Sequence, residues 1–236
     1  MKQLKMSALV LALTSIATGS AMAQSSKTNA WEGFYGQVGV GFGIFTPSIS
    51  NGTATKAGYP TFTTSASNVN NVNTGLANLA AGYNFGINQN FILGIGATYY
   101  PGASSSATGT LNTTYNGAVL STTAATYNVK NLYSVVLTPG YVIDKDKLAY
   151  AKVGYTGATI GLSSPVIPYN ATNLTGYTLG IGYKQMVTSS IYAFGEFNYA
   201  SYGSATASST TTTGFNVNNS AKGTGTDLLV GLGYRF

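Results

Sequence analysis

Residues 228–236 read LLVGLGYRF, and large apolar side chains occupy every second position of this stretch. Gly231, Gly233 and Arg235 lie between them. Such a period of two is typical of a β-strand whose two faces meet different surroundings. The stretch therefore predicts a strand with one apolar, aromatic face and one face of small or polar side chains. The apolar face consists of Leu228, Val230, Leu232, Tyr234 and Phe236.

The same alternation recurs seven more times along the chain, and each run is 9–12 residues long. This is the length of a tilted β-strand that crosses a bilayer. No run of 18 consecutive apolar residues follows residue 23, so we do not expect helical membrane spans. The eight runs are 34–44, 76–87, 91–100, 132–143, 148–158, 176–186, 191–201 and 228–236.

The composition of the second face decides between a soluble β-sandwich and a membrane barrel. A sandwich also alternates, but its core needs large apolar side chains from both sheets. Here the second face is mostly glycine and small polar residues, and only 7% of the chain is charged. A narrow barrel with apolar and aromatic residues outside and small polar residues inside fits this pattern. The predicted fold class is all-β, an eight-stranded antiparallel up-and-down transmembrane β-barrel.

The connections between the predicted strands alternate between long and short. This alternation is typical of barrels with long extracellular loops and short periplasmic turns. An even number of strands also places both ends of the barrel on the periplasmic side. The predicted short turns are 88–90, 144–147 and 188–190, and the predicted long loops are 45–74, 101–130, 163–173 and 203–226.

Residues 1–23 have the pattern of a secretory signal peptide. Lys2 and Lys5 precede an apolar run that ends near Ile16, and residues 21–23 read AMA, an A-x-A cleavage site. The apolar run is shorter than the roughly 20 residues that a transmembrane helix needs. We therefore expect a signal peptide over 1–23, export by the general secretory route, and one barrel domain over 24–236.

Composition also argues against several classes of function. The chain has a net charge of +6, which falls to +4 without the two lysines of residues 1–23, and the remaining lysines are scattered. Nucleic-acid binding needs clustered basic residues and is not expected. The absence of His and Cys removes the usual general base, the thiol nucleophile and the commonest metal ligands. The five acidic residues form no carboxylate pair at a useful spacing, so we expect no enzyme activity, cofactor or metal.

Four charged residues nevertheless fall on the inward face of consecutive predicted strands: Lys152, Lys184, Glu196 and Arg235. A charge inside a narrow lumen must be paired or hydrated. We expect Glu196 to be the hub of a polar network that plugs the lumen, with Lys152, Lys184 or Arg235 as partners. The alternative is that the basic side chains extend to the periplasmic mouth instead.

The chain resembles the bacterial outer-membrane protein β-barrel family, which includes opacity-protein-like and porin-like barrels of OmpA/OmpX shape. Its last strand is similar to the C-terminal assembly signal of these barrels, with Gly231, Tyr234 and Phe236 at the matching positions. The resemblance implies a place in the outer membrane of a Gram-negative bacterium. It also implies contact with outer-membrane lipid and lipopolysaccharide, and with the barrel-assembly machinery through the C-terminal strand. The similar stretches are 31–43, 80–100, 176–203 and 230–236.

Three functions stay open from the sequence. The favoured one is a structural and surface-interaction role in which the barrel displays four polar extracellular loops. The alternatives are a narrow, low-conductance porin-like channel and a binder of a small or lipidic ligand. Eight strands enclose an interior just wide enough for side chains, which disfavours a general pore. The predicted loops are rich in Ser, Thr, Asn and Gly and show no hydrophobic anchor cluster, so the loop partner is unknown.

Overall fold

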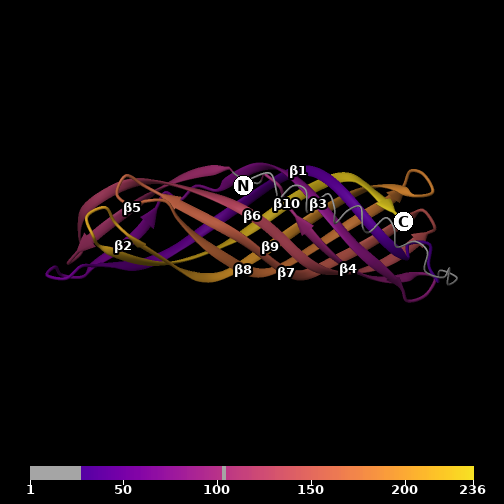
Figure 1. Ribbon diagram of the computed structural model, residues 1–236, viewed down its shortest axis with the longest axis horizontal. Helices are drawn as coiled ribbons and strands as arrows, with labels where there is room; N and C mark the ends of the chain where they lie inside the picture. The colour runs from indigo at the N-terminus through magenta and orange to yellow at the C-terminus, as the bar shows by residue number, and fades with distance from the viewer. Residues whose placement is uncertain (1–27, 103–104) are drawn as a thin grey trace, which may run out of the picture.

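The computed structural model describes residues 28–102 and 105–236. The predicted signal peptide, residues 1–23, lies outside these ranges. The described chain forms one elongated antiparallel sheet of ten strands that closes on itself (Figure 1). The strands are β1 (Gly33–Thr55), β2 (Phe62–Ser67), β3 (Val72–Gly86), β4 (Phe91–Tyr99), β5 (Ser106–Tyr115), β6 (Ala118–Asp144), β7 (Lys147–Ser163), β8 (Asn170–Met186), β9 (Ile191–Thr210) and β10 (Asn216–Arg235).

Eight of the strands form a hydrogen-bonded ring in the order β1, β3, β4, β6, β7, β8, β9, β10. The ring closes where β1 pairs with β10, from Tyr35 opposite Arg235 to Thr55 opposite Asn216. Closure leaves no unpaired strand edge in the ring, which is the condition for a sheet to cross lipid. The predicted eight-stranded antiparallel barrel is confirmed. No helix in the described part of the chain is long and apolar enough to cross a membrane.

β2 and β5 continue the barrel beyond the ends of β3 and β4. β2 pairs with β1 and with β5, and β5 pairs with β6, so these two strands take the place of β3 and β4 in an upper ring. Figure 1 shows them at the end of the barrel opposite the C-terminus. The prediction of long loops was therefore wrong over much of their length, because most of those residues belong to strands. The remaining connections at this end include 56–61, 116–117, 164–169 and 211–215, whereas 68–71 joins β2 to β3 part-way along the barrel.

Along a single strand, the outward side chains change from apolar to polar and the inward side chains include large apolar residues. Within β1 the outward side chains change from apolar to polar after Ile44. The next residue, Phe45, lies at an inward position of the strand and is buried. The apolar part of the barrel surface matches lipid and the polar part matches water. We call the polar part, residues 46–71, 105–130, 159–173 and 203–224, the extracellular segment. The outward positions of β1 are in order Val38, Val40, Phe42, Ile44, Thr46, Ser48 and Ser50.

In β6 a β-bulge accompanies this exchange. The pairing of β6 with β7 shifts between Lys130 and Tyr133, and Asn131 has a φ of 52°. Asparagine is one of the few residues that adopt this left-handed conformation readily. The bulge reverses the parity of the strand, so that Val129 and Ser134 both face the interior.

Two groups of exposed aromatic side chains flank the apolar band of the barrel, as in the aromatic girdles of transmembrane barrels. One group lies at the end with the short turns and includes Phe34, Tyr83, Phe85, Phe91, Tyr141, Tyr183, Tyr234 and Phe236. The other lies near the extracellular segment and includes Tyr99, Tyr133, Tyr155 and Tyr177. We call the group at the end with the short turns the periplasmic girdle, after the side that the sequence predicts for these turns, and β10 ends there.

Candidate functional site

Aromatic rings fill much of the lumen, contrary to the expectation of a small and polar interior. A buried cluster in the periplasmic half includes Trp31, Tyr192 and Phe194, and the rings of Trp31 and Tyr192 meet edge to face at 5.7 Å between centroids. Inward glycines make room for these rings. A β-carbon at Gly182 would overlap the ring of Tyr150, and one at Gly233 would overlap the ring of Tyr192. The small residues were read correctly as inward, but they accommodate large neighbours.

A second apolar cluster lies above the first, at the base of the extracellular segment. Its buried members are Phe45, Val72, Tyr127, Val129, Ala158, Leu174 and Tyr202. Between the two clusters the inward positions of β9 carry Glu196 and Asn198, both nearly fully buried. The lumen thus contains apolar, polar and apolar layers in succession.

Glu196 is the centre of the polar layer. Lys152 Nζ donates to Glu196 Oε2 at 2.8 Å, which makes a fully buried ion pair. Tyr150 Oη and Gln37 Nε2 donate to Glu196 Oε1 at 2.5 and 3.2 Å. Tyr192 Oη in turn donates to the side-chain oxygen of Gln37 at 3.1 Å. The carboxylate therefore has the multiple donors that a buried anion requires.

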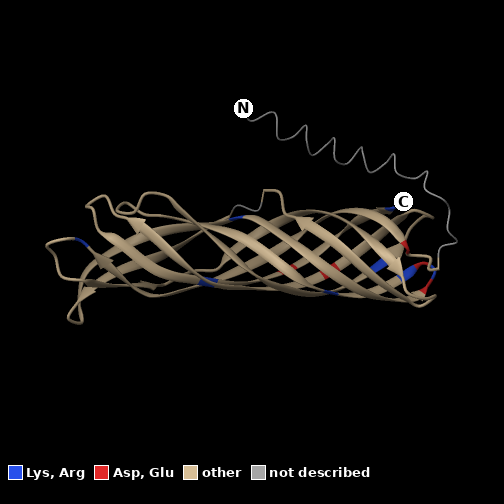
Figure 2. Cartoon of the chain, turned by 60° about the horizontal axis from the view of Figure 1, so that its bottom comes forward, with Lys and Arg blue, Asp and Glu red and all other residues tan. Residues whose placement is uncertain are grey.

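This network crosses the barrel. Gln37 lies on β1 and Lys152 on β7, and these strands stand four places apart in the ring of eight, on opposite sides of the lumen. Glu196 lies on β9, two places from each of them. Its side chain thereby connects opposite walls. Charged residues are sparse elsewhere along the barrel (Figure 2).

A second acidic residue extends the network toward the extracellular side. Asn198 Nδ2 donates to Asp227 Oδ1 at 2.8 Å and contacts Glu196 Oε2 at 3.5 Å. Asn198 therefore bridges the two carboxylates through its amide group. The chain of polar contacts runs from β1 through β9 to β10.

Lys184 lies beside the network without joining it through a hydrogen bond. Its ammonium nitrogen sits 4.2, 4.8 and 5.0 Å from the ring centroids of Tyr35, Tyr192 and Tyr150. Aromatic faces attract a cation at such distances. The sequence offered Lys184 as a possible partner of Glu196, but three aromatic rings surround its ammonium group instead.

Lys184→Met should change the free energy of unfolding by no more than about 1 kcal/mol. The substitution removes the favourable cation–π attraction, but it also removes the unfavourable burial of an ammonium group, and the two effects nearly cancel. Urea titration of the barrel in lipid vesicles measures this. The matched substitution Lys152→Met should cost far more, since it leaves Glu196 buried without its cation. Equal losses for the two variants would contradict the assignment of different environments.

Arg235 does not take part in the network. Its guanidinium donates to the backbone carbonyls of Ala30 and Ser189 at the periplasmic end, so the predicted partnership with Glu196 was wrong for this residue. In the nearby turn between β6 and β7, Lys147 Nζ donates to Asp144 Oδ2 at 2.7 Å. This hydrogen bond lowers the pKa of the exposed Asp144 carboxyl. Both sets of contacts lie at the periplasmic rim of the barrel and include no residue of the Glu196 network.

Tyr150 and Gln37, which donate to Glu196, and Tyr192, which donates to Gln37, were not predicted as members of the network. Strand parity could have identified two of them, because Tyr150 lies two residues from Lys152, and Tyr192 lies four residues from Glu196. The alternation of residues 34–44 puts Gln37 on the inward face as well, but only the order of strands around the ring shows that it faces Glu196.

The residues of the predicted assembly signal lie where β10 meets the periplasmic girdle. Tyr234 and Phe236 face outward and are half exposed, with their ring centroids 4.9 Å apart. The Phe236 backbone N–H donates to the carbonyl of Phe34 at 3.0 Å, next to the closing pair of strands. Gly231 faces inward beneath the ring of Phe194.

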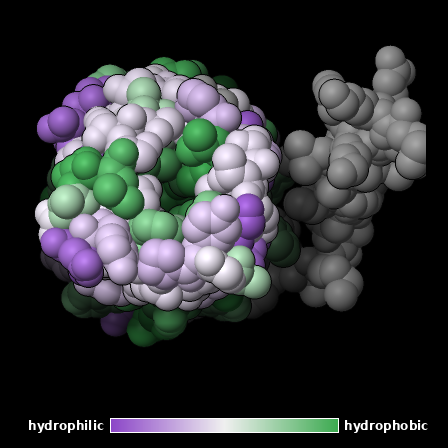
Figure 3. Space-filling view, turned by 90° about the vertical axis from the view of Figure 1, so that its left-hand side faces the viewer, coloured by the Kyte–Doolittle hydropathy of each residue, from purple (hydrophilic) through white to green (hydrophobic). Residues whose placement is uncertain are grey.

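The extracellular end carries an aromatic cluster that the sequence analysis did not expect. Phe62 packs against Phe215 and Tyr115, and Tyr59 packs against Phe215, with centroid distances of 5.3–5.7 Å. Lys56 Nζ lies 5.2 Å from the Tyr59 ring. We call Tyr59, Phe62, Tyr115 and Phe215 the tip aromatic cluster. Viewed from this end, apolar surface (green) gathers around the mouth of the barrel (Figure 3).

Comparison with known proteins identifies similar sequences and folds. A family model described as "Outer membrane protein beta-barrel domain" matches residues 9–236. The outer membrane protein OprG from Pseudomonas aeruginosa is 12% identical with a TM-score of 0.56, over 87% of this chain and 97% of that one. The outer membrane protease OmpT from Escherichia coli is 10% identical with a TM-score of 0.51, over 86% and 96%.

The attachment invasion locus protein Ail of Yersinia pestis is 14% identical with a TM-score of 0.42, over 86% of this chain and 99% of that one. A search of curated proteins found no match. At such low identities the likeness to OprG and OmpT shows a shared fold and nothing about substrate or partner.

Proposed function

The chain belongs to the outer membrane protein β-barrel domain family, and on this premise we propose that it is a structural and surface-interaction protein of the Gram-negative outer membrane. The tip aromatic cluster is the observation that carries the proposal. In this role, outer-membrane lipid and lipopolysaccharide surround the apolar band. The barrel-assembly machinery engages the C-terminal strand.

The composition of the tip supports a protein as the partner. Tyrosine and phenylalanine rings supply large contact area at low cost in side-chain entropy, and they dominate binding hot spots. Small polar residues surround the cluster, and Lys56 is the charged side chain in contact with it. Aromatic anchors among Ser, Thr, Asn and Gly also characterise antibody combining sites, which bind protein surfaces.

The filled lumen argues against the alternative of a porin-like channel. A water-filled path needs a continuous polar interior, whereas here the Glu196–Lys152 pair lies between two apolar clusters. We also propose that the protein catalyses no reaction. Glu196 is neutralised by Lys152, and the described residues contain no group of three His, Cys, Asp or Glu side chains that could hold a metal ion.

Replacing two members of the cluster tests the proposal. Bacteria that display Tyr59→Ser/Phe215→Ser should adhere at least roughly 30-fold more weakly to protein-coated surfaces and cell monolayers, the factor for a hot spot of about 2 kcal/mol. Tyr169→Ser is the matched control, because this exposed ring lies in the connection between β7 and β8 and is not a member of the cluster. Adhesion that is unchanged in the cluster variant, or absent from the wild type, would contradict a surface-interaction role.

Planar-bilayer recordings supply a second, independent measurement. The refolded barrel should show no stable conductance steps, because the lumen is filled. Regular single-channel steps in the wild-type protein would instead support the porin-like alternative.

A further inference from the structure

The wall of the extracellular segment is not paired continuously around the barrel. The backbone pairing of β8 with β9 stops at Gly176 opposite Tyr202, although both strands continue beyond this point. Residues 170–175 of β8 still pair with β7, and residues 205–210 of β9 still pair with β10. Within this described stretch no backbone pairing joins the two facing edges. We call this boundary the β8–β9 seam.

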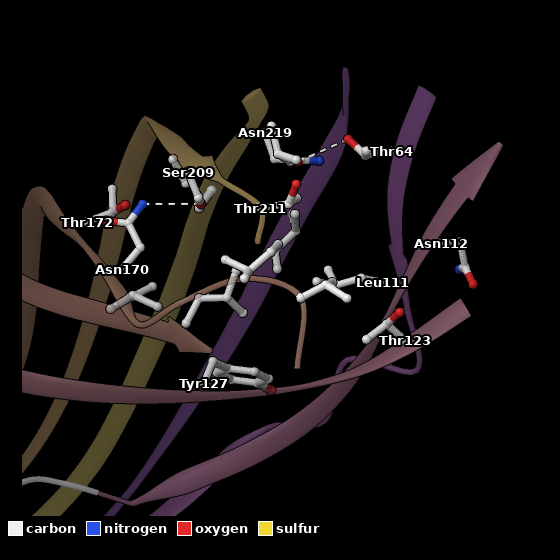
Figure 4. Close-up of a pocket in the computed structure, with 18 of the residues that line it drawn as sticks. Thr64, Leu111, Asn112, Thr123, Tyr127, Asn170, Thr172, Ser209, Thr211 and Asn219 are labelled. Atoms are coloured by element: carbon white, nitrogen blue, oxygen red, sulfur yellow. Dashed lines mark hydrogen bonds between the residues drawn. The ribbon is translucent and has the colours of Figure 1, made fainter. Parts of the chain in front are cut away.

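Among the described residues, three hydrogen bonds cross the seam above its base. Asn170 Nδ2 donates to the Ser208 carbonyl oxygen and to Ser209 Oγ, the latter at 3.2 Å, as a dashed line in Figure 4 shows. Above them, the Thr212 backbone N–H donates to the Val166 carbonyl oxygen at 2.9 Å. A regular ladder would hold the two strands together along their whole length. Here the side chain of Asn170 replaces it.

Asn170 and Ser209 also separate a cavity from the outer surface. Behind the seam the extracellular segment encloses a cavity of about 120 Å³, which Thr172 lines from β8 and Ala207 from β9. In front of the seam lies an open polar groove, to which the exposed Ser208 contributes. Asn170 and Ser209 line both the cavity and the groove. Their hydrogen bond is therefore part of the partition between the two.

The base of the seam is held by apolar contact. Leu174 and Tyr202, at the lower end of the unpaired stretch, are both buried members of the upper apolar cluster. Segments with few backbone hydrogen bonds between them are the ones that open locally in folded proteins. The upper part of the seam can thus separate while its base stays packed, with β8 moving with β7 and β9 with β10.

We propose that the β8–β9 seam is a gate through which small solutes pass between the external medium and the cavity. When the two hydrogen bonds of Asn170 break, the cavity and the groove become continuous. The outward face of the extracellular segment is polar, so water can bind the backbone groups along the open edges. The Glu196 network lies below the upper apolar cluster and stays closed, so the gate gives access to the cavity without a path across the membrane.

Thiol labelling of the full barrel in amphipol tests the gate. The chain contains no cysteine, so Ala221→Cys places a single thiol in the cavity wall, at a buried position of β10. Methyl methanethiosulfonate is the reagent, and mass spectrometry follows the reaction. Asn170→Leu keeps a side chain branched at Cγ but loses both hydrogen bonds, and it should speed labelling about 25-fold, a factor of about five for each bond. Ser209→Ala removes one of them and should speed labelling about fivefold.

Asn173→Leu is the matched control. Asn173 lies on the same strand, but its side chain accepts a hydrogen bond from Thr159 at 2.9 Å, across the paired boundary with β7. This variant should label at the rate of the Ala221→Cys parent. Labelling that Asn170→Leu does not accelerate would overturn the gate, since the reagent would then enter by another route. Equal acceleration by Asn173→Leu would overturn it too, because general loss of stability would explain the effect.

Hydrogen exchange followed by mass spectrometry tests the seam without any substitution. Backbone amides of residues 205–210 should exchange faster than those of residues 126–128 of β6, which pair on both sides with β5 and β7. Equal protection of the two segments would overturn the proposal. The labelling variants change no residue of the tip aromatic cluster, so this proposal and the surface-interaction role fail separately.

Discussion

Glu196→Gln is expected to lower the free energy of unfolding of the barrel by about 3 kcal/mol. The substitution keeps the shape of the side chain but removes the negative charge beside Lys152, whose ammonium group lies 2.8 Å away and is almost completely buried. Among the described residues this buried ammonium donates to no other carboxylate, so the substitution leaves its charge without a partner. The loss should appear as a lower urea midpoint for the barrel refolded in lipid vesicles.

Lys152→Met/Glu196→Gln is the informative companion. Removing both charges avoids the uncompensated ion, and buried ion pairs replaced as a unit often leave stability nearly unchanged. The double variant should therefore recover most of the loss. A Glu196→Gln protein within about 0.5 kcal/mol of wild type would show that water reaches Lys152 and that the network does not plug the lumen.

Removal of Phe236 is expected to reduce the amount of barrel in the outer membrane several-fold and leave unassembled protein in the periplasm. Phe236 contributes an outward ring in the periplasmic girdle, and its backbone N–H donates to Phe34, next to the pair of strands that closes the barrel. Loss of the residue removes both the terminal aromatic of the predicted assembly signal and a contact that secures closure. Fractionation of the membranes followed by immunoblotting measures the effect.

Phe236→Tyr is the matched control, because it keeps an aromatic ring and the backbone hydrogen bond. It should assemble like wild type. Full assembly of the shortened chain would contradict the assignment of the last strand as an assembly signal.

The transmembrane strands could be predicted because their apolar side chains keep one parity over a whole run. The extracellular segment could not, since its apolar side chains occupy the opposite parity: Ile44 points outward and Phe45 inward in the same strand. Read from the sequence, this exchange looks like the end of a strand. In β6 the bulge at Asn131 interrupts the pattern further.

The candidate sites, like the strands, could be predicted from the sequence only in part. Parity alone placed Lys152 and Glu196 in the lumen, but it could not show that Lys184 lies among three tyrosine rings. The tip aromatic cluster was beyond prediction, because Tyr59 and Phe215 are 156 residues apart and no periodic pattern relates them. Such contacts depend on ring closure and on the stagger of the strands.

The strands continue beyond the point where their outward side chains change from apolar to polar, and this also fixes how far the barrel extends from the membrane. Residues 118–130 of β6 lie beyond the bulge, and 13 residues at about 3.3 Å each, tilted by about 40°, rise roughly 30 Å. The barrel thus ends in a rigid β-sheet extension that holds the tip aromatic cluster at a fixed distance from the bilayer. A flexible loop of the same length would reach many heights but would lose conformational freedom on contact. The strands of this extension have lost that freedom already on folding, so in the proposed surface-interaction role a partner would bind the tip without that entropic cost.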